Sequence, residues 1–131
     1  MWINRDPFAI IVYGRAMPNI LGRILGRIFD IPIGGTPPAV AFFYFVFLIP
    51  ELKGNVPVLK HELKHIKQKW QLLRYGDPDR CLKIEVEAYR EQLKWCASPE
   101  SDAWAFAYGL SHGYNMHIST EEAHDLLTRD N

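Results

Sequence analysis

The sequence predicts an α+β domain that is mostly helical and has a small sheet. Runs rich in aromatic and β-branched residues fall within the first fifty positions, and apolar residues at three- and four-residue spacing dominate the remainder. A chain of 131 residues has the size of a single domain with one sizeable core. We therefore expect a strand, a helix and a loop in residues 1–38, a central unit in residues 39–96, and two supporting helices in residues 97–131.

Charge and composition argue against several classes of partner. Fifteen basic residues balance fifteen acidic ones, so no net field is expected to recruit nucleic acid or an anionic membrane. The N-terminus lacks the basic, long apolar and small-residue regions of a signal peptide. Cys81 and Cys96 are expected about 22 Å apart on one helix, too far for a disulfide. Together these features predict a cytoplasmic protein with reduced thiols.

The first 38 residues contain one strand pattern and one helix pattern. Phe8–Tyr13 has the aromatic and β-branched content of a short strand, bounded by a proline and a glycine. Residues 19–29 place isoleucines and leucines at helical spacing, with Arg23 and Arg27 opposite, which predicts an amphipathic helix on the core. A membrane role for this segment is less favoured because the arginines interrupt its apolar surface.

The most apolar stretch of the chain runs from Ala39 to Ile49. Its aromatic and β-branched content, with prolines at both ends, predicts a strand at about residues 40–49 that is buried on both faces. The stretch is too short to cross a bilayer as a helix, which takes about 20 residues. The alternative is a surface that meets a protein partner or a lipid interface.

The next segment carries a metal-binding pattern. Residues 61–65 have the sequence His-Glu-Leu-Lys-His within a helix expected at about 56–75, with Asn55 as its N-cap. His61 and His65 lie one turn apart on a stripe of their own, so both imidazoles can reach one tetrahedral zinc ion. The alternative is a pair of ordinary histidines with solvated neighbours. The side chains expected to pack on the core form a second stripe: Leu59, Leu63, Ile66, Trp70 and Leu73.

A second helix, expected at about residues 79–96, offers two candidates for a third ligand. Glu87 belongs to a continuous charged arc and is expected to be a solvated surface residue, whereas Glu85 has mostly apolar neighbours. A carboxylate that faces the interior is costly unless it is paired or bound to metal, and zinc held by His61 and His65 would supply that partner. A salt bridge from Glu85 to an arginine of the first third is the alternative.

Two segments, His61-Glu-Leu-Lys-His-Ile-Lys-Gln68 and Glu85-Val-Glu-Ala-Tyr89, together resemble zincin metallopeptidases of the gluzincin type. They are especially similar to the short His-Glu-x-x-His-x-x-Gln proteins often encoded by bacteriophages and prophages. The resemblance covers roughly residues 39–96 and implies a minimal zincin-like fold. It also implies Zn²⁺ ligation by His61, His65 and Glu85, with Glu62 as general base and a substrate along the preceding strand. Tyr89 stands where many gluzincins have an aspartate that orients a histidine, and a phenol can form that hydrogen bond.

The C-terminal third is expected to support the site. Ser98 and Pro99 begin a helix that is apolar almost all round from Ala103 to Leu110 and is therefore predicted to be buried. Ser119 opens a last short helix with a capping box. Candidates for a second contact to the ligands or for stabilising an oxyanion are Gln68, Tyr89, Tyr108 and His112.

Two classes of function follow from these patterns. The favoured one is a zinc-dependent peptidase, in which Glu62 takes a proton from metal-activated water and passes it to the leaving amine of a peptide or protein substrate. The alternative is a binding or assembly protein, such as a phage-particle component, whose zinc only holds the fold. In that case the Ala39–Ile49 run meets a protein partner, and the location is virion-associated rather than cytoplasmic.

Overall fold

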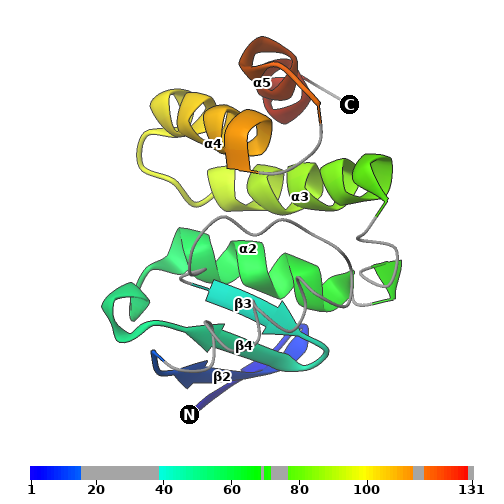
Figure 1. Ribbon diagram of the computed structural model, residues 1–131. Coiled ribbons are helices and arrows are strands. Elements are labelled where there is room, and N and C mark those ends of the chain that lie inside the picture. The colour runs from blue at the N-terminus through cyan, green and yellow to red at the C-terminus, as the bar shows by residue number, and fades with distance from the viewer. Residues whose placement is uncertain (16–38, 69, 72–76, 114–116, 130–131) are drawn as a thin grey trace.

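The computed structural model describes residues 1–15, 39–68, 70–71, 77–113 and 117–129 of the chain. A four-stranded sheet lies at one end of the molecule, and the helices of the described ranges are stacked above one of its faces (Figure 1). This arrangement confirms the predicted α+β class, mostly helical with a small sheet.

The sheet is mixed and has the strand order β1-β2-β4-β3. β1 (Trp2–Arg5) pairs antiparallel with β2 (Phe8–Tyr13), which runs parallel to β4 (Phe45–Leu48). β3 (Ala39–Phe42) pairs antiparallel with β4 at the other edge. The strand predicted at Phe8–Tyr13 is confirmed. β1 was not predicted, because four residues, two of them polar, are too few to show a strand periodicity.

The prediction of one strand over residues 40–49, buried on both faces, is wrong. The run folds into the β3–β4 hairpin, and Phe43 in the turn has φ 52°, in the left-handed region. The side chains from Phe42 to Phe45 are between 36% and 45% exposed, whereas Val46 and Leu48 are buried. No glycine or asparagine marks the turn, so the sequence gives no signal that the chain reverses there. Contact between this exposed aromatic turn and a protein partner stays a prediction.

Helix α2 (Val56–Lys67) packs on the sheet and positions the histidines. Asn55 is its N-cap, as predicted, and accepts a hydrogen bond from the Val58 N–H (3.1 Å). A single 3₁₀ turn, η1 (Pro50–Leu52), precedes it. The buried residues of the first core cluster join the helix to β2 and β4: Ala9, Ile11, Val46, Leu48, Leu63 and Ile66. Because the apolar stripe of α2 faces the sheet, its histidine stripe is turned toward the next helix.

α2 ends earlier than predicted. It stops at Lys67, with Gln68 as C-cap, instead of continuing for about two more turns. The Gln68 N–H is shared between two carbonyls of the preceding turn, at 3.0 and 3.1 Å, which is typical of a helix end. Helical spacing therefore no longer places Trp70 on the core, and this side chain is 69% exposed, with its ring 6.5 Å from that of Phe43. Residues 72–76, including the expected core residue Leu73, lie outside the described ranges.

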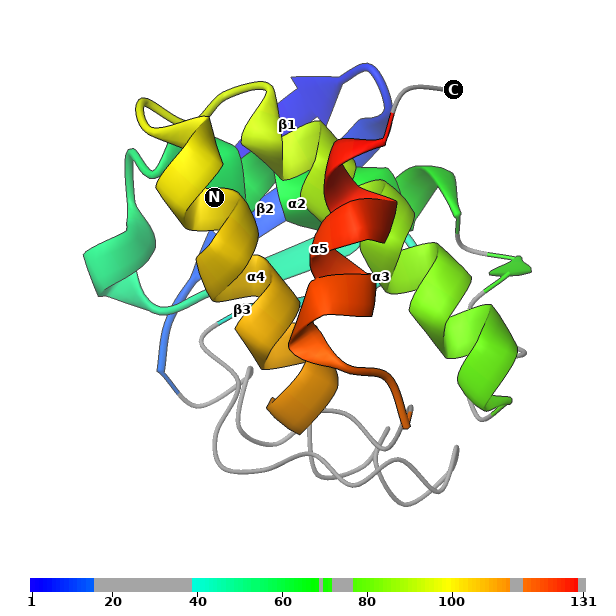
Figure 2. The same cartoon turned by 90° about the horizontal axis from the view of Figure 1, so that it is seen from above.

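Three further helices form the second half of the molecule. α3 (Pro78–Leu93) lies on α2, and α4 (Pro99–Gly113) and α5 (Thr120–Thr128) lie side by side across its other side (Figure 2). The predicted N-cap of α5 is confirmed, because Ser119 Oγ accepts from the Glu122 N–H (3.1 Å), and the same hydroxyl donates to the Glu122 carboxylate (3.0 Å). The second core cluster lies among these helices: Cys81, Ala107, Leu110, Ala123 and Leu127.

The prediction that α4 is buried all round is wrong. Ala103, Ala107 and Leu110 are buried, but Trp104 and Tyr108 are 48% and 60% exposed. The helix is an outer element of the stack, so only one of its faces is covered by neighbours. An apolar composition shows that a helix can contribute side chains to a core. The position of the helix in the stack decides how much of its apolar surface is buried.

The remaining predictions concern the first third, the cysteines and the membrane. The helix expected at residues 19–29 and the loop that follows it lie within residues 16–38, outside the described ranges. Cys81 and Cys96 are both free thiols, which agrees with the expected absence of a disulfide between them. None of the helices that the structure describes has the length and hydropathy needed to cross a bilayer.

Candidate metal centre

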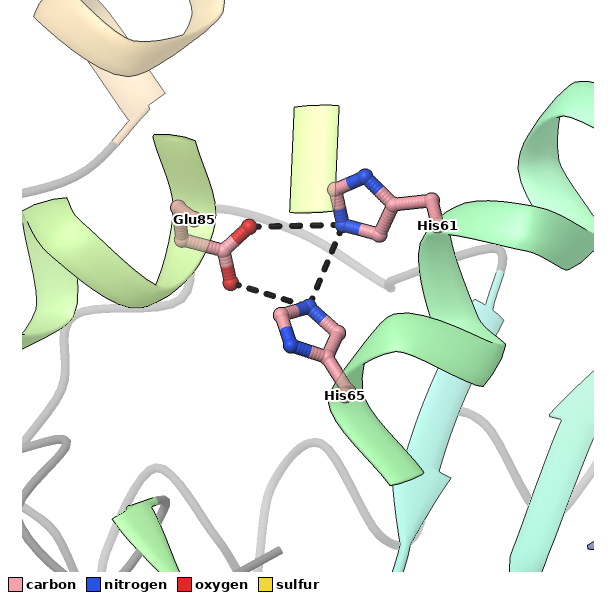
Figure 3. Close-up of side chains that lie close together, drawn as sticks. All are labelled: His61, His65 and Glu85. Atoms are coloured by element: carbon pink, nitrogen blue, oxygen red, sulfur yellow. Dashed lines mark hydrogen bonds and ion pairs between the residues drawn. The ribbon is translucent and has the colours of Figure 1, made fainter. Parts of the chain in front are cut away.

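The three ligand candidates come together where α2 meets α3. His61 and His65 project from successive turns of α2, and Glu85 projects from α3 toward them (Figure 3). All three are buried, with exposed fractions of 7%, 7% and 3%. The site therefore lies between the two core clusters, with the sheet fixing the orientation of one helix and α4 and α5 covering the other.

The distances among these side chains are short enough for them to hold one metal ion. His61 Nε2 lies 3.2 Å from His65 Nε2 and 3.3 Å from Glu85 Oε2, and His65 Nε2 lies 3.3 Å from the other carboxylate oxygen, Oε1. With one ligand atom taken from each residue, the three atoms lie within 4.8 Å of one another. Two imidazole nitrogens and a carboxylate are a set of ligands that zinc sites use.

In the metal-free chain the same groups form a buried ion-pair cluster. Burial disfavours charge on His65, but the nearby charge of Glu85 and its hydrogen bond outweigh burial and raise the pKa of His65 to about 9. Burial also opposes ionisation of Glu85, yet the two histidines hold the pKa of this carboxyl well below its usual range. Glu85 is thus a buried anion, neutralised by a protonated imidazole when no metal is present.

Glu62 lies beside His61 on α2 and is itself buried, with 7% of its surface exposed. Burial raises the pKa of its carboxyl, and the neighbouring His61 and His65 offset this effect only in part. A carboxylate with a raised pKa is a stronger base than an ordinary carboxylate. Glu62 therefore has the properties that proton transfer at this site requires.

Gln68 contacts His65 and connects it to α3. The Gln68 Oε1 lies 3.0 Å from His65 Nδ1, and the Gln68 Nε2 donates to the Ile84 carbonyl (3.2 Å) and to the Glu87 carboxylate (2.7 Å). Gln68 is 3% exposed, so these contacts are made in the interior. The motif's glutamine thus spans from a ligand on α2 to two positions that flank Glu85 on α3.

The prediction that Glu87 is a solvated surface residue is wrong. The side chain is half-buried and accepts the hydrogen bond from Gln68. A helical wheel compares Glu87 only with residues of its own helix, and it does not show that the C-terminal end of α2 lies alongside. Ile84 and Glu87 are three positions apart and so share one side of α3. The sequence of α3 alone does not show that Gln68, at the end of α2, contacts this side.

The other predicted polar residues separate into two groups. Tyr89 lies against the site, with its ring 4.4 Å from that of His61, and it stacks on Phe106 at 4.8 Å. Tyr108 and His112 stack on each other at 4.0 Å on the exposed surface of α4. Stabilisation of an oxyanion by any of these three stays a prediction.

Comparisons with protein-family models, curated proteins and solved structures find no match. The chemistry of the centre therefore rests on its own geometry and electrostatics.

We expect added zinc to remove the pH dependence of stability that His65 gives the metal-free chain. The pKa of His65 is raised from 6.5 to about 9 in the folded, metal-free chain. The stabilisation that protonated His65 gives the fold is therefore complete below pH 6.5 and is lost as pH rises through about 9. A shift of this size corresponds to about 3 kcal/mol in the free energy of unfolding. Zinc requires a deprotonated His65, so protons compete with the metal, and the stabilisation that zinc adds increases as pH rises over the same window. This increase offsets the loss in the metal-free chain, so stability with saturating zinc should be nearly constant there.

Urea unfolding of the full chain between about pH 6.5 and about pH 9, with a chelator and with buffered zinc, measures both slopes. At lower pH, Glu85 gives stability the opposite pH dependence, because the pKa of its carboxyl is lowered in the folded chain. The stabilisation that ionised Glu85 gives the fold is lost as pH falls below the ordinary pKa of 4.5. His124→Gln, which alters a histidine that stacks on Trp104 at 3.7 Å, should leave both slopes unchanged. An equally steep fall in stability with and without zinc would contradict the cluster.

Proposed function

We propose that the protein is a zinc-dependent metallopeptidase. The supporting observation is the convergence of His61, His65 and Glu85 at separations of 3.2–3.3 Å, with the buried Glu62 beside them. When bound, zinc supplies a Lewis acid and makes water acidic enough to act as a nucleophile near neutral pH. Three protein ligands leave room in a tetrahedral shell for a reactant, as in catalytic zinc sites.

Glu62 is the general base and then the general acid in this proposal. Its carboxylate takes a proton from the attacking water and passes it to the nitrogen of the leaving amine. The raised pKa of Glu62 suits both steps, because a strongly acidic carboxylate would be a poor base and would release its proton too early. Glu85, with its lowered pKa, stays ionised and is suited to ligation rather than to proton transfer.

The sheet edge supports a peptide as the substrate. β3 is an edge strand in the described sheet, and α2 packs directly against it. An extended peptide that pairs with β3 would run beside the helix that carries the histidines, held through its main chain with little dependence on sequence. β4, the other half of the apolar run, is paired on both sides and is not available for such pairing.

Zinc content and peptide hydrolysis test the proposal together. We expect the purified chain to hold one zinc ion per molecule and to generate new amino termini from an unstructured protein substrate. A chelator should stop this release, and added zinc should restore it. A chain that contains stoichiometric zinc but leaves every peptide intact would contradict the peptidase proposal.

A structural role for the zinc is the second candidate function. It is favoured by the burial of the ligands, since His61, His65, Glu85 and the neighbouring Glu62 are each less than a tenth exposed. Side chains buried to this extent leave little room for a substrate, which suits a metal that only holds the fold. In this case the metal joins α2 to α3, and the exposed aromatic turn at Phe42–Phe45 meets a protein partner, such as another component of a phage particle.

A further inference from the structure

We propose that Gln68 and Glu87 together set which nitrogen of His65 faces the metal, so that both are positioning residues for the site. The inference rests on the proposed zinc site, but not on peptidase activity. It follows from the chain of hydrogen bonds from Glu87 through the Gln68 amide to the His65 ring.

The orientation of the Gln68 amide is fixed by its partners on α3. A carboxylate and a backbone carbonyl can only accept hydrogen bonds, so the amide NH₂ must point to Glu87 (2.7 Å) and Ile84 (3.2 Å). The amide oxygen is then directed at His65 Nδ1, 3.0 Å away. An amide oxygen can only accept, so Nδ1 must carry the proton.

A proton on Nδ1 leaves the lone pair of the neutral ring on Nε2. That is the atom that lies 3.2–3.3 Å from His61 and Glu85, where the metal is expected. Without Gln68 the neutral ring could place its proton on Nε2 and lose the ability to bind metal in this orientation. The three groups thus select Nε2 as the His65 nitrogen that faces the metal.

Burial and charge make this arrangement effective. Gln68 is 3% exposed, so water does not readily replace its partners, and a hydrogen bond to an ionised carboxylate is stronger than one between neutral groups. His61 Nδ1 is different, since it is buried with no hydrogen-bond partner among the described residues. His65 is therefore the ligand whose orientation is set by the protein around it.

Zinc affinity in Gln68→Met and Glu87→Met variants tests the proposal. Methionine keeps the length of both side chains but removes their hydrogen bonds. Competition with a chromophoric chelator should show a loss of zinc affinity of about 10–100-fold for Gln68→Met, the usual effect of losing a group that orients a ligand. Glu87→Met should cause a smaller loss, because the Ile84 carbonyl still holds the amide. Glu91→Met is the matched control, one turn further along α3, where the native carboxylate pairs with Lys94 (2.9 Å), and it should bind zinc like the wild type.

The double variant separates this role from a general structural one. Because Glu87 acts only through Gln68, Gln68→Met with Glu87→Met should bind zinc no more weakly than Gln68→Met alone. The ¹⁵N shifts of His65 in the zinc-loaded chain should show zinc on Nε2 and a proton on Nδ1 in the wild type, and a mixture of the two arrangements in Gln68→Met.

Three results would each overturn the proposal. They are wild-type zinc affinity in Gln68→Met, additive losses of affinity in the double variant, and absence of zinc binding by the wild type. If Gln68→Met does not fold, the comparison of Glu87→Met with Glu91→Met decides, because Glu87 is only half-buried. Equal affinity in those two variants would also overturn it. A wild type that binds zinc but hydrolyses nothing would end the peptidase proposal and leave this one intact.

Discussion

Replacing Glu62 with glutamine is expected to abolish peptide hydrolysis while zinc stays bound. Glutamine has the shape of the native side chain but cannot accept the proton of the attacking water, and general acid–base catalysis contributes about 10²–10⁴-fold to a rate. The ligands His61, His65 and Glu85 are unchanged, so zinc per chain should match the wild type. Burial already disfavours the charged form of Glu62, so a neutral amide should also keep the fold. Steady-state hydrolysis and metal analysis on one preparation measure both properties.

Lys64→Gln is the control for this substitution. Lys64 is a half-buried residue of α2 and belongs to the charged face of the helix in the sequence pattern. Its loss should change neither the rate nor the zinc content. Unchanged hydrolysis in Glu62→Gln would remove Glu62 from the mechanism, and an unchanged biological function without any hydrolysis would favour the structural role.

Truncating Glu85 to alanine is expected to reduce zinc from one ion per chain to a trace. Two imidazoles remain, but the buried anion that neutralises the cation is lost. The metal-free chain should also be less stable by about 3–5 kcal/mol, because removing one partner of a buried pair leaves the other uncompensated. The pKa of His65 should fall at the same time, since the Glu85 charge is the main cause that raises it.

Metal analysis and urea unfolding of Glu85→Ala measure these effects. Glu91→Ala, on the same helix, removes a carboxylate that forms an ion pair with Lys94, and it should keep full zinc content and lose little stability. Stoichiometric zinc in Glu85→Ala would show that the third ligand lies elsewhere.

The convergence of the three ligand candidates could be predicted because it depends mostly on helix geometry. Two histidines four positions apart must share a face of α2, whatever the rest of the fold does. Glu85 could be chosen over Glu87 because a carboxylate among apolar neighbours needs a partner. The contact between Glu87 and Gln68 could not be predicted in the same way, because it depends on how α3 is placed along α2.

The other differences between the predicted and the observed structure also arise from tertiary contacts. The hairpin turn puts Phe43 at a positive φ, a conformation that phenylalanine rarely adopts and that nothing in the local sequence marks. The exposure of Trp70 follows from where α2 ends, and that of Trp104 follows from the outer position of α4. In each case the residue type is compatible with burial, but no neighbouring element of the described chain covers the side chain enough to bury it.

The polar character of the α2–α3 boundary has a consequence for how the two halves of the molecule are aligned. Apolar surfaces attract without regard to direction, so a purely apolar boundary would tolerate sliding of one helix along the other. Here two imidazoles and an amide on the α2 side must meet a carboxylate and a backbone carbonyl of α3 at distances of 3.2–3.3 Å. A slip of one turn, about 5.4 Å, would separate all of these pairs at once. The same side chains that make a metal site therefore define a single register between the sheet-bound helix and the helical layer above it.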